Sequence, residues 1–153
     1  MGAENIEEFA AASAGEEELL AFLEHFGAEL RGVTGEGIAA GLGDLVAQVD
    51  VEALTDSFAD FLAGAMREAV AYGVWGWLDD DLAFMRDWGF DPGAIERPVA
   101  IWQGSEDRMV PAPHGAWLAA HVAGARAQLL DGEGHISILL GCYGALLDDL
   151  LDR

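Results

Sequence analysis

Two residues near the C-terminus are of the types that exchange a proton during catalysis. Asp107 lies in a polar loop over residues 104–111, and His135 ends a second loop over residues 131–135. A carboxylate beside a histidine fixes the ring tautomer and stabilises the imidazolium that forms when the ring accepts a proton. The pair therefore predicts two of the three groups of a nucleophile–histidine–acid site, with Glu106 as the alternative acid.

Both loops follow segments that are typical of buried strands. Residues 98–102 form a short apolar run that begins with proline, and residues 125–130 form a second short run. Helical patterns cover residues 113–122 and 136–151, so the order is strand, helix, strand, helix. In an open α/β sheet, functional groups lie just beyond the carboxyl ends of the strands, which is where these loops fall. A parallel sheet of only two strands is not stable by itself.

The chain before these strands is expected to be helical. Ala, Leu, Glu and Phe dominate it, and apolar residues recur at intervals of three and four. Ser13 and Asp50 are expected to cap helices, and Asp91-Pro92-Gly93 ends the helical region. We predict a helical region over residues 1–93 and a strand-containing region over residues 94–153. The expected helices in the first region are residues 16–30, 36–48, 50–72 and 76–87.

The charge excludes several classes of partner. The 153 residues, enough for one domain, carry 28 acidic and 7 basic side chains, for a net charge of −21. All seven basic residues are arginine. Binding to nucleic acid or to an anionic membrane requires clustered cations, so neither partner is expected. The charge is uneven: 21 acids and 3 arginines fall in residues 1–96, but 7 acids and 4 arginines in residues 97–153.

The same composition predicts a cytoplasmic protein. No apolar run approaches the roughly 20 residues of a membrane-spanning helix. The first eight residues are acidic and lack the features of a signal peptide. The single cysteine, Cys142, forms no internal disulfide and is expected to be a small buried residue.

The residues around the two loops resemble the C-terminal end of α/β-hydrolase fold enzymes. That family has a strand, a G-x-x-D-x-x-V-P loop with the triad acid, a helix, a strand and a G-H loop with the triad histidine. The matching residues here are Gly104, Asp107, Val110 and Pro111, then His114, Leu118 and Ala119, then Gly134 and His135. The resemblance implies a partial α/β-hydrolase fold in which Asp107 is the triad acid and His135 is the general base.

The helical region is similar to the caps that these enzymes insert before their last strands. The similarity lies in residues 75–80 and 88–91. It implies that residues 1–93 are an acidic cap-like region and that residues 94–153 are the C-terminal part of a hydrolase core. Four aromatic residues are candidates for a substrate pocket beneath such a cap, although aromatics at this spacing also suit a core. They are Trp75, Trp77, Phe84 and Trp88.

The family's nucleophile is missing from this sequence. It lies on a G-x-S-x-G elbow, and none of the four serines (Ser13, Ser57, Ser105 and Ser137) has that context. There is also no aspartate on such an elbow and no HG-type oxyanion loop. The resemblance therefore implies the C-terminal half of a serine-type hydrolase of ester, amide or related bonds. We expect it to be inactive alone, and to act on a small-molecule substrate only when the missing half completes it.

Other polar residues have simpler explanations. The three aspartates at residues 79–81 are expected at a helix start, where the helix dipole favours acids without any metal. His25, His114 and His121 are expected to be surface or packing residues, because no third ligand accompanies the last two. We therefore expect no metal and no cofactor.

Two alternatives to the hydrolase hypothesis remain. A two-stranded sheet with open edges favours a non-catalytic interaction module that forms a homo-oligomer or pairs with a complementing chain. The third possibility is an unrelated small acidic helical protein whose motifs match by chance.

Overall fold

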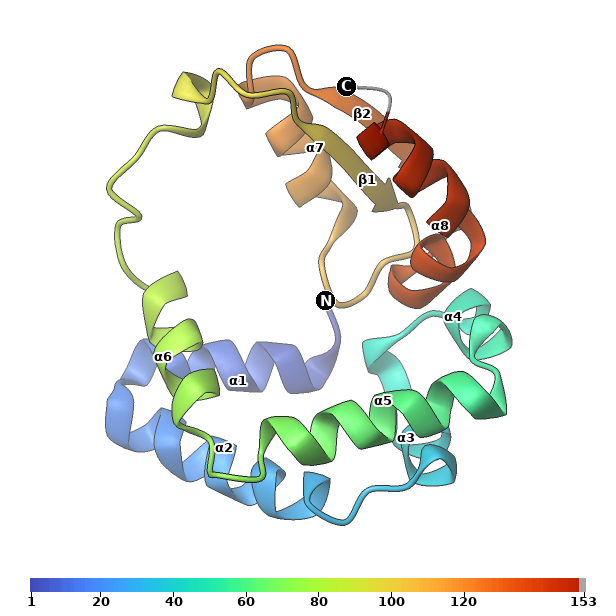
Figure 1. The fold of residues 1–153 in the computed structure, drawn as a ribbon. Helices are drawn as coiled ribbons and strands as arrows, with labels where there is room; N and C mark the ends of the chain where they lie inside the picture. The colour runs from blue at the N-terminus through green and yellow to red at the C-terminus, as the bar shows by residue number, and fades with distance from the viewer. Residues whose placement is uncertain (152–153) are drawn as a thin grey trace. The chain divides into compact units, whose positions relative to one another are not determined.

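The computed structural model describes residues 1–151, which are mostly helical and contain one two-stranded parallel sheet. The α/β class and the order strand, helix, strand, helix are as predicted (Figure 1). The chain forms two compact units, and each is described by itself. The helical unit comprises residues 3–43 and 55–88. The sheet unit comprises residues 1–2, residues 44–54 and the chain from Gly89 onward.

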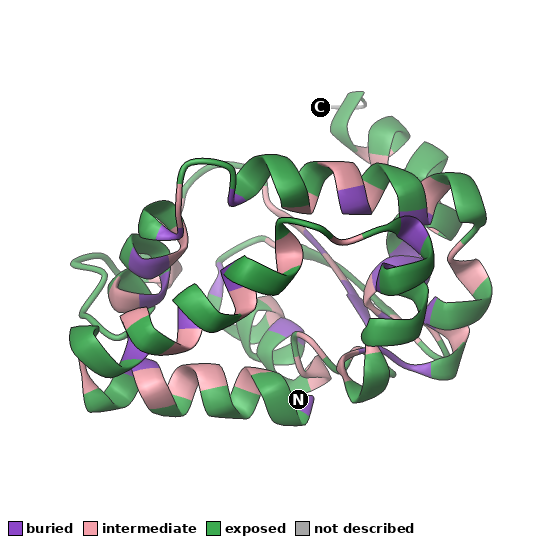
Figure 2. Cartoon of the chain, turned by 90° about the horizontal axis from the view of Figure 1, so that it is seen from below, coloured by how far each residue is buried: buried purple, intermediate pink, exposed green. Residues whose placement is uncertain are grey.

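The helical unit contains five helices. Three of them pack around a core of small and branched side chains, with Leu19 and Leu23 fully buried. Ala12, Val74 and Leu78 complete that core. Apolar residues recur at helical spacing because each helix buries one stripe, and exposed residues cover most of each helix surface (Figure 2). The helices are α1 (Ala3–Ala14), α2 (Glu16–Leu30), α3 (Gly35–Gly41), α5 (Asp56–Ala69) and α6 (Trp75–Phe84).

The sheet unit contains the two strands and three helices. β1 (Ala100–Gly104) and β2 (Arg126–Leu130) pair in parallel, with Ala100 opposite Arg126. The helices are α4 (Gln48–Ala53), α7 (Ala112–His121) and α8 (His135–Leu151). Two 3-10 turns, η1 (Gly43–Leu45) and η2 (Pro92–Ala94), complete the elements.

Helices cover both faces of β1. The Gln103 side chain lies against Gly115 of α7, and the Trp102 indole is 3.5 Å from an Asp149 carboxyl oxygen on α8. Adjacent strand residues point to opposite faces, so α7 and α8 lie on opposite sides of the sheet. β2 is less covered, since four of its five residues are exposed.

Both edges of the sheet are open within residues 1–151. Backbone hydrogen bonds from Arg126 to Val99 and from Ser105 to Leu130 fix which groups the ladder uses. In a parallel pair, every second residue of a strand directs its N–H and C=O to the partner strand. The backbone groups of Ala100 and Trp102 therefore point away from β2. None of these outward groups has a hydrogen-bond partner in the described part of the chain.

Several helix boundaries differ from those expected. α1 was not predicted, and Ser13 lies inside it, where its hydroxyl donates to the Phe9 carbonyl instead of capping a helix. Gly15 separates α1 from α2 with a φ of +136°, a conformation that side chains disfavour. The helix expected over residues 36–48 is instead α3, followed by η1 and the start of α4.

The long helix expected over residues 50–72 is also wrong. Thr55, not Asp50, caps α5, and its hydroxyl accepts from the Phe58 amide at 3.4 Å. Asp50 instead lies within the short helix α4. The aspartates at residues 79–81 lie in the middle of α6, not at its start, so the helix dipole does not explain them.

Candidate functional site

The loop after β1 fixes the carboxylate of Asp107. One carboxyl oxygen, Oδ1, accepts hydrogen bonds from the backbone amides of Met109 at 2.9 Å and Val110 at 2.8 Å. An aspartate that accepts from amides two and three residues later forms an Asx-type turn. The side chain is only 6% exposed. The loop therefore holds the second oxygen, Oδ2, in a defined direction.

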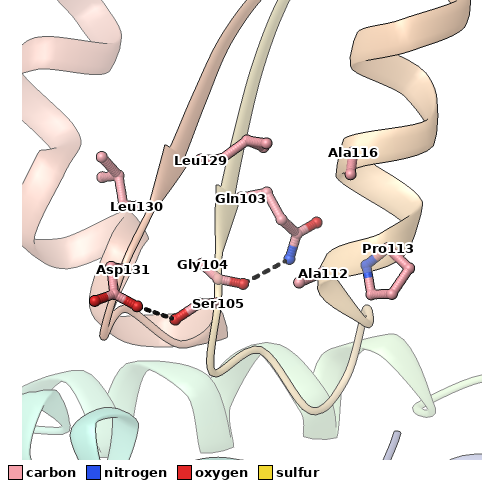
Figure 3. Close-up of a pocket in the computed structure, with 9 residues that line it drawn as sticks. All are labelled: Gln103, Gly104, Ser105, Ala112, Pro113, Ala116, Leu129, Leu130 and Asp131. Atoms are coloured by element: carbon pink, nitrogen blue, oxygen red, sulfur yellow. Dashed lines mark hydrogen bonds between the residues drawn. The ribbon is translucent and has the colours of Figure 1, made fainter.

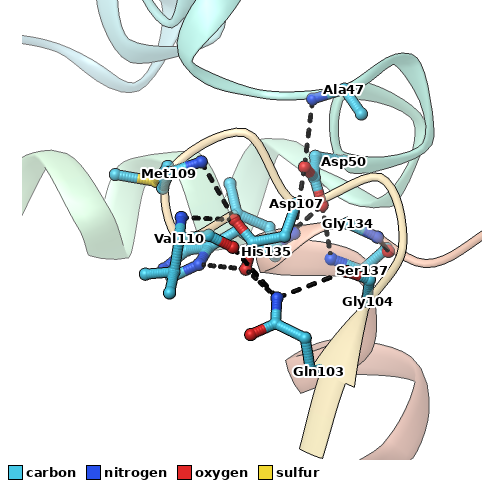
Figure 4. A network of polar contacts seen from close by, with 11 residues as sticks. Ala47, Asp50, Gln103, Gly104, Asp107, Met109, Val110, Gly134, His135 and Ser137 are labelled. Carbon is cyan, nitrogen blue, oxygen red and sulfur yellow. Dashed lines mark hydrogen bonds and ion pairs between the residues drawn. The ribbon is translucent and has the colours of Figure 1, made fainter. Parts of the chain in front are cut away.

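That second oxygen meets the ring of His135. The distance from His135 Nδ1 to Asp107 Oδ2 is 3.0 Å (Figure 4). The Gln103 amide Nε2 also donates to Oδ2, at 3.2 Å. The other ring nitrogen, Nε2, has no hydrogen-bond partner within residues 1–151, and the imidazole side chain is 41% exposed. The structure thus brings together the predicted acid and base, in a partly exposed ring whose Nε2 is free of partners within residues 1–151. The alternative acid, Glu106, is exposed.

Two glycines allow the two loops to approach each other. A Cβ at Gly104 would lie 2.2 Å from the Glu133 carbonyl oxygen and 2.8 Å from the Gly134 carbonyl oxygen. A Cβ at Gly134 would lie 2.2 Å from a carboxyl oxygen of Asp50. Both contacts are far too short for any side chain, so the G-x-x-D and G-H motifs require glycine for packing reasons.

Asp50 is a member of this network that sequence reasoning missed. Its side chain is fully buried, and it accepts from the backbone amides of His135, Ile136 and Ser137 at the start of α8. It also accepts from the amide of Ala47, at the start of α4. The contact spans 85 residues of sequence, and no local pattern signals it.

The serines near the site have other partners. The Ser105 hydroxyl donates to Asp131 at 3.3 Å and accepts from the Gly132 amide at 2.9 Å. The Ser137 hydroxyl donates to Glu133 at 2.6 Å and accepts from the Gly134 amide at 2.8 Å. These bonds stabilise the histidine loop, and neither hydroxyl is bonded to the His135 ring.

A cavity of about 520 Å³ lies between α7 and the ends of the strands (Figure 3). Gln103 links it to the acid, because the same side chain lines the cavity and donates to Asp107. Its walls are mainly apolar, and sequence reasoning did not identify it. The other lining residues are Gly104, Ser105, Ala112, Pro113, Ala116, Leu129, Leu130 and Asp131.

The four aromatic residues predicted to line a substrate pocket belong to the helical unit. Trp75, Phe84 and Trp88 are exposed. Trp77 is half-buried, and its indole N–H donates to Glu8 at 2.5 Å. Phe84 packs edge-on against Phe9, with ring centroids 6.2 Å apart. Their role in a substrate pocket stays a prediction.

Glu8 and Asp81 form a pair of carboxyls beside Trp77. Burial and the neighbouring Asp81 charge raise the pKa of Glu8 to about 7. Burial also raises the pKa of Asp81, and the negative charge of Asp80 adds to that rise. One oxygen of Asp81 is buried with no hydrogen-bond partner among the described residues. A shared proton relieves the repulsion between the two carboxyls.

Residues 1–151 contain no cluster of metal-ligating side chains and no helix that could cross a membrane. No three His, Cys, Asp or Glu side chains converge as a metal ion would require. None of the helices combines the length and the apolar character needed to cross a bilayer.

Comparison with known proteins gives no match, whether to a family model, a curated protein or a solved structure.

Proposed function

We propose that this chain supplies the acid and the base of a serine-type α/β hydrolase that acts on ester, amide or related bonds. One observation carries the proposal. The Asp107 carboxylate lies 3.0 Å from His135 Nδ1, while Nε2 of the same ring is free within residues 1–151. That is the arrangement in which a histidine takes a proton from a nucleophile.

The chemistry assigned to each residue follows from that arrangement. His135 Nε2 accepts the hydroxyl proton as the nucleophile attacks the carbonyl carbon, and later donates it to the leaving group. Asp107 keeps the Nδ1 proton in place and stabilises the imidazolium between these two steps. Gln103 and the amides of Met109 and Val110 hold the acid in position.

The nucleophile and the oxyanion hole are to be supplied by another chain or segment. None of the four serines lies in a G-x-S-x-G context, and the two near the site are bonded to other groups. We therefore expect this chain alone to provide neither the hydroxyl that attacks the substrate carbonyl nor the oxyanion hole.

Assays with p-nitrophenyl esters and p-nitroanilide amides test this proposal. The purified chain should show no turnover that depends on His135, so His135→Ala should leave the background rate unchanged. His114→Ala is the matched control, because it deletes a histidine from α7 of the same unit. In parallel, the His135 ring nitrogens should show by NMR a proton held on Nδ1, and Asp107→Asn should abolish that signal. If the chain alone turned over substrate, and His135→Ala abolished that turnover while His114→Ala retained it, the proposal that the chain lacks a nucleophile would be contradicted. An unchanged ring signal in Asp107→Asn would contradict the acid–base pair.

The open sheet edges favour a second function, an interaction module. Ala100 and Trp102 on one edge, and Ala127 and Leu129 on the other, turn backbone groups outward without partners in the described chain. A strand from a second copy or from a complementing chain would satisfy them.

Light scattering tests this second function. An assembly that forms through a sheet edge should dissociate when Ala100→Pro or Ala127→Pro removes an outward N–H without breaking the β1–β2 ladder. Gln128→Pro, which removes an N–H that the ladder uses, is the control for general loss of the sheet. A strictly monomeric wild-type chain that acquires no partner strand would contradict the interaction function.

A further inference from the structure

The first turn of α8 takes its cap from a distant part of the sequence. The amides at the start of any helix lack partners within that helix, and an acceptor from outside must satisfy them if they are buried. α8 has no acidic residue in its first turn. Instead the Asp50 carboxylate accepts from His135 at 3.1 Å, Ile136 at 2.7 Å and Ser137 at 2.8 Å (Figure 4).

The same carboxylate also fixes its own helix. The Ala47 amide at the start of α4 donates to Asp50 Oδ2 at 3.1 Å, so one side chain joins the first turns of two helices. Its exposure is 0%, and four backbone hydrogen bonds replace the water that the carboxylate has lost. Gly134 makes this approach possible, because a Cβ there would overlap the carboxyl group.

Two carboxylates therefore hold His135 in different ways. Asp107 contacts ring atom Nδ1, and Asp50 contacts the backbone amide of the same residue. A ring can remain 3.0 Å from its acid only if the backbone that carries it is fixed, since a shift of 1 Å would break the bond.

We propose that Asp50 is a positioning residue for the general base: its buried carboxylate fixes the first turn of α8 so that the His135 ring meets Asp107. The inference rests on the proposed acid–base role of His135. It assigns to the 44–54 segment, which sequence reasoning placed in a cap, a part in the proton-transfer geometry. Asp50 itself touches neither the ring nor a substrate, so it acts only through His135.

Two NMR measurements on the full chain test the inference. The first is the state of the His135 ring nitrogens, which reports the Nδ1–Asp107 contact. The second is hydrogen exchange of the amides of residues 135–137, which reports the Asp50 cap. Asp50→Asn keeps the size of the side chain but puts an NH₂ group against an amide that needs an acceptor. We expect this variant to lose the Nδ1-bound ring signal and to exchange these amides at least tenfold faster.

Two further variants make the outcomes distinguishable. Asp107→Asn should remove the ring signal and leave amide exchange at residues 135–137 unchanged. Ser137→Ala removes the two hydrogen bonds of this hydroxyl, to Glu133 and Gly134, but keeps the Asp50 contact, and should leave the ring signal unchanged. If Asp50→Asn keeps the ring signal while Asp107→Asn loses it, the positioning role is refuted and the acid–base pair survives. If Asp107→Asn also keeps it, the proposed function itself fails.

The wild-type chain gives a further test if Asp50→Asn does not fold. The first turn of α2 begins after Gly15, which provides no side-chain cap. Amides of residues 135–137 should therefore exchange at least a hundredfold more slowly than those of residues 16–18. Equal exchange at the two helix starts would show that the Asp50 cap does not hold this turn, and would overturn the inference.

Discussion

Replacing Glu8 with glutamine should remove much of the pH dependence of folding from the helical unit. Glu8 lies on α1, facing Asp81 and Trp77 on α6. The folded chain keeps the Glu8 proton up to a pKa of about 7, whereas a carboxyl in the unfolded chain loses it near 4.5. Between these values the folded state binds more protons, so the contribution of Glu8 to stability is greatest below pH 4.5 and is lost as the pH rises through 7.

The size of the effect follows from the two pKa values. If the full rise in the Glu8 pKa acted on folding, the free energy of unfolding would fall by about 2.5 kcal/mol between pH 5 and pH 8. Glu8 is only partly buried, so solvent screening reduces the expected loss to about 1 kcal/mol. Glutamine carries no charge and its oxygen still accepts from the Trp77 indole. Glu8→Gln should therefore stabilise the chain by about 1 kcal/mol at pH 8 and change little at pH 5.

Urea unfolding at pH 5 and pH 8, followed by tryptophan fluorescence, measures this difference. Glu7→Gln is the matched control, because it removes the same charge from an exposed neighbouring position on α1. The control separates the local pair from the general repulsion in a chain of net charge −21. The reasoning is refuted if Glu8→Gln retains the wild-type pH dependence, or if Glu7→Gln gains as much stability at pH 8.

Four other substitutions have defined expectations in urea unfolding. Gly104→Ala should lower the free energy of unfolding by about 2 kcal/mol or more, because its Cβ would collide with the backbone of the histidine loop. Gly141→Ala should raise the free energy of unfolding by up to about 1 kcal/mol, because Gly141 has open space around it in α8. Leu23→Ala should cost about 2–5 kcal/mol, since this side chain is fully buried in the helical core. Arg126→Gln should cost less than about 1 kcal/mol, because its ion pair with Asp149 lies at the surface, and a larger loss would contradict that estimate.

The strands and the two polar loops could be predicted because local sequence determines them. The apolar run before Gly104 and the run before Asp131 each end in turn residues, so the observed strands lie within two residues of the predicted ones. The loops follow directly, and the sheet brings them together because parallel strands end at the same edge. Once the two strands are predicted correctly, Asp107 and His135 are expected to lie side by side.

The role of Asp50 could not be predicted, because it depends on a long-range contact. An aspartate before an apolar helical pattern is a normal cap signal, and on that basis Asp50 was expected to start a helix. It lies inside α4, where it accepts from the Ala47 amide, and it also caps α8, 85 residues away. The position of Asp81 was also predicted wrongly: acids at residues 79–81 suited a helix start, yet Asp81 lies within α6, where it is buried near Glu8. Local patterns identify a capping side chain but not the helix that it caps.

The two sequence motifs, which appear separate in the chain, form one packed structure. The glycine of the first motif makes room for the loop of the second, since a Cβ at Gly104 would overlap the carbonyls of Glu133 and Gly134. The glycine of the second motif in turn makes room for Asp50. The contacts that hold Asp107 and His135 therefore all lie in the sheet unit, within residues 44–54 and 98–138. None of these contacts involves a nucleophile, so the acid–base geometry should persist without one.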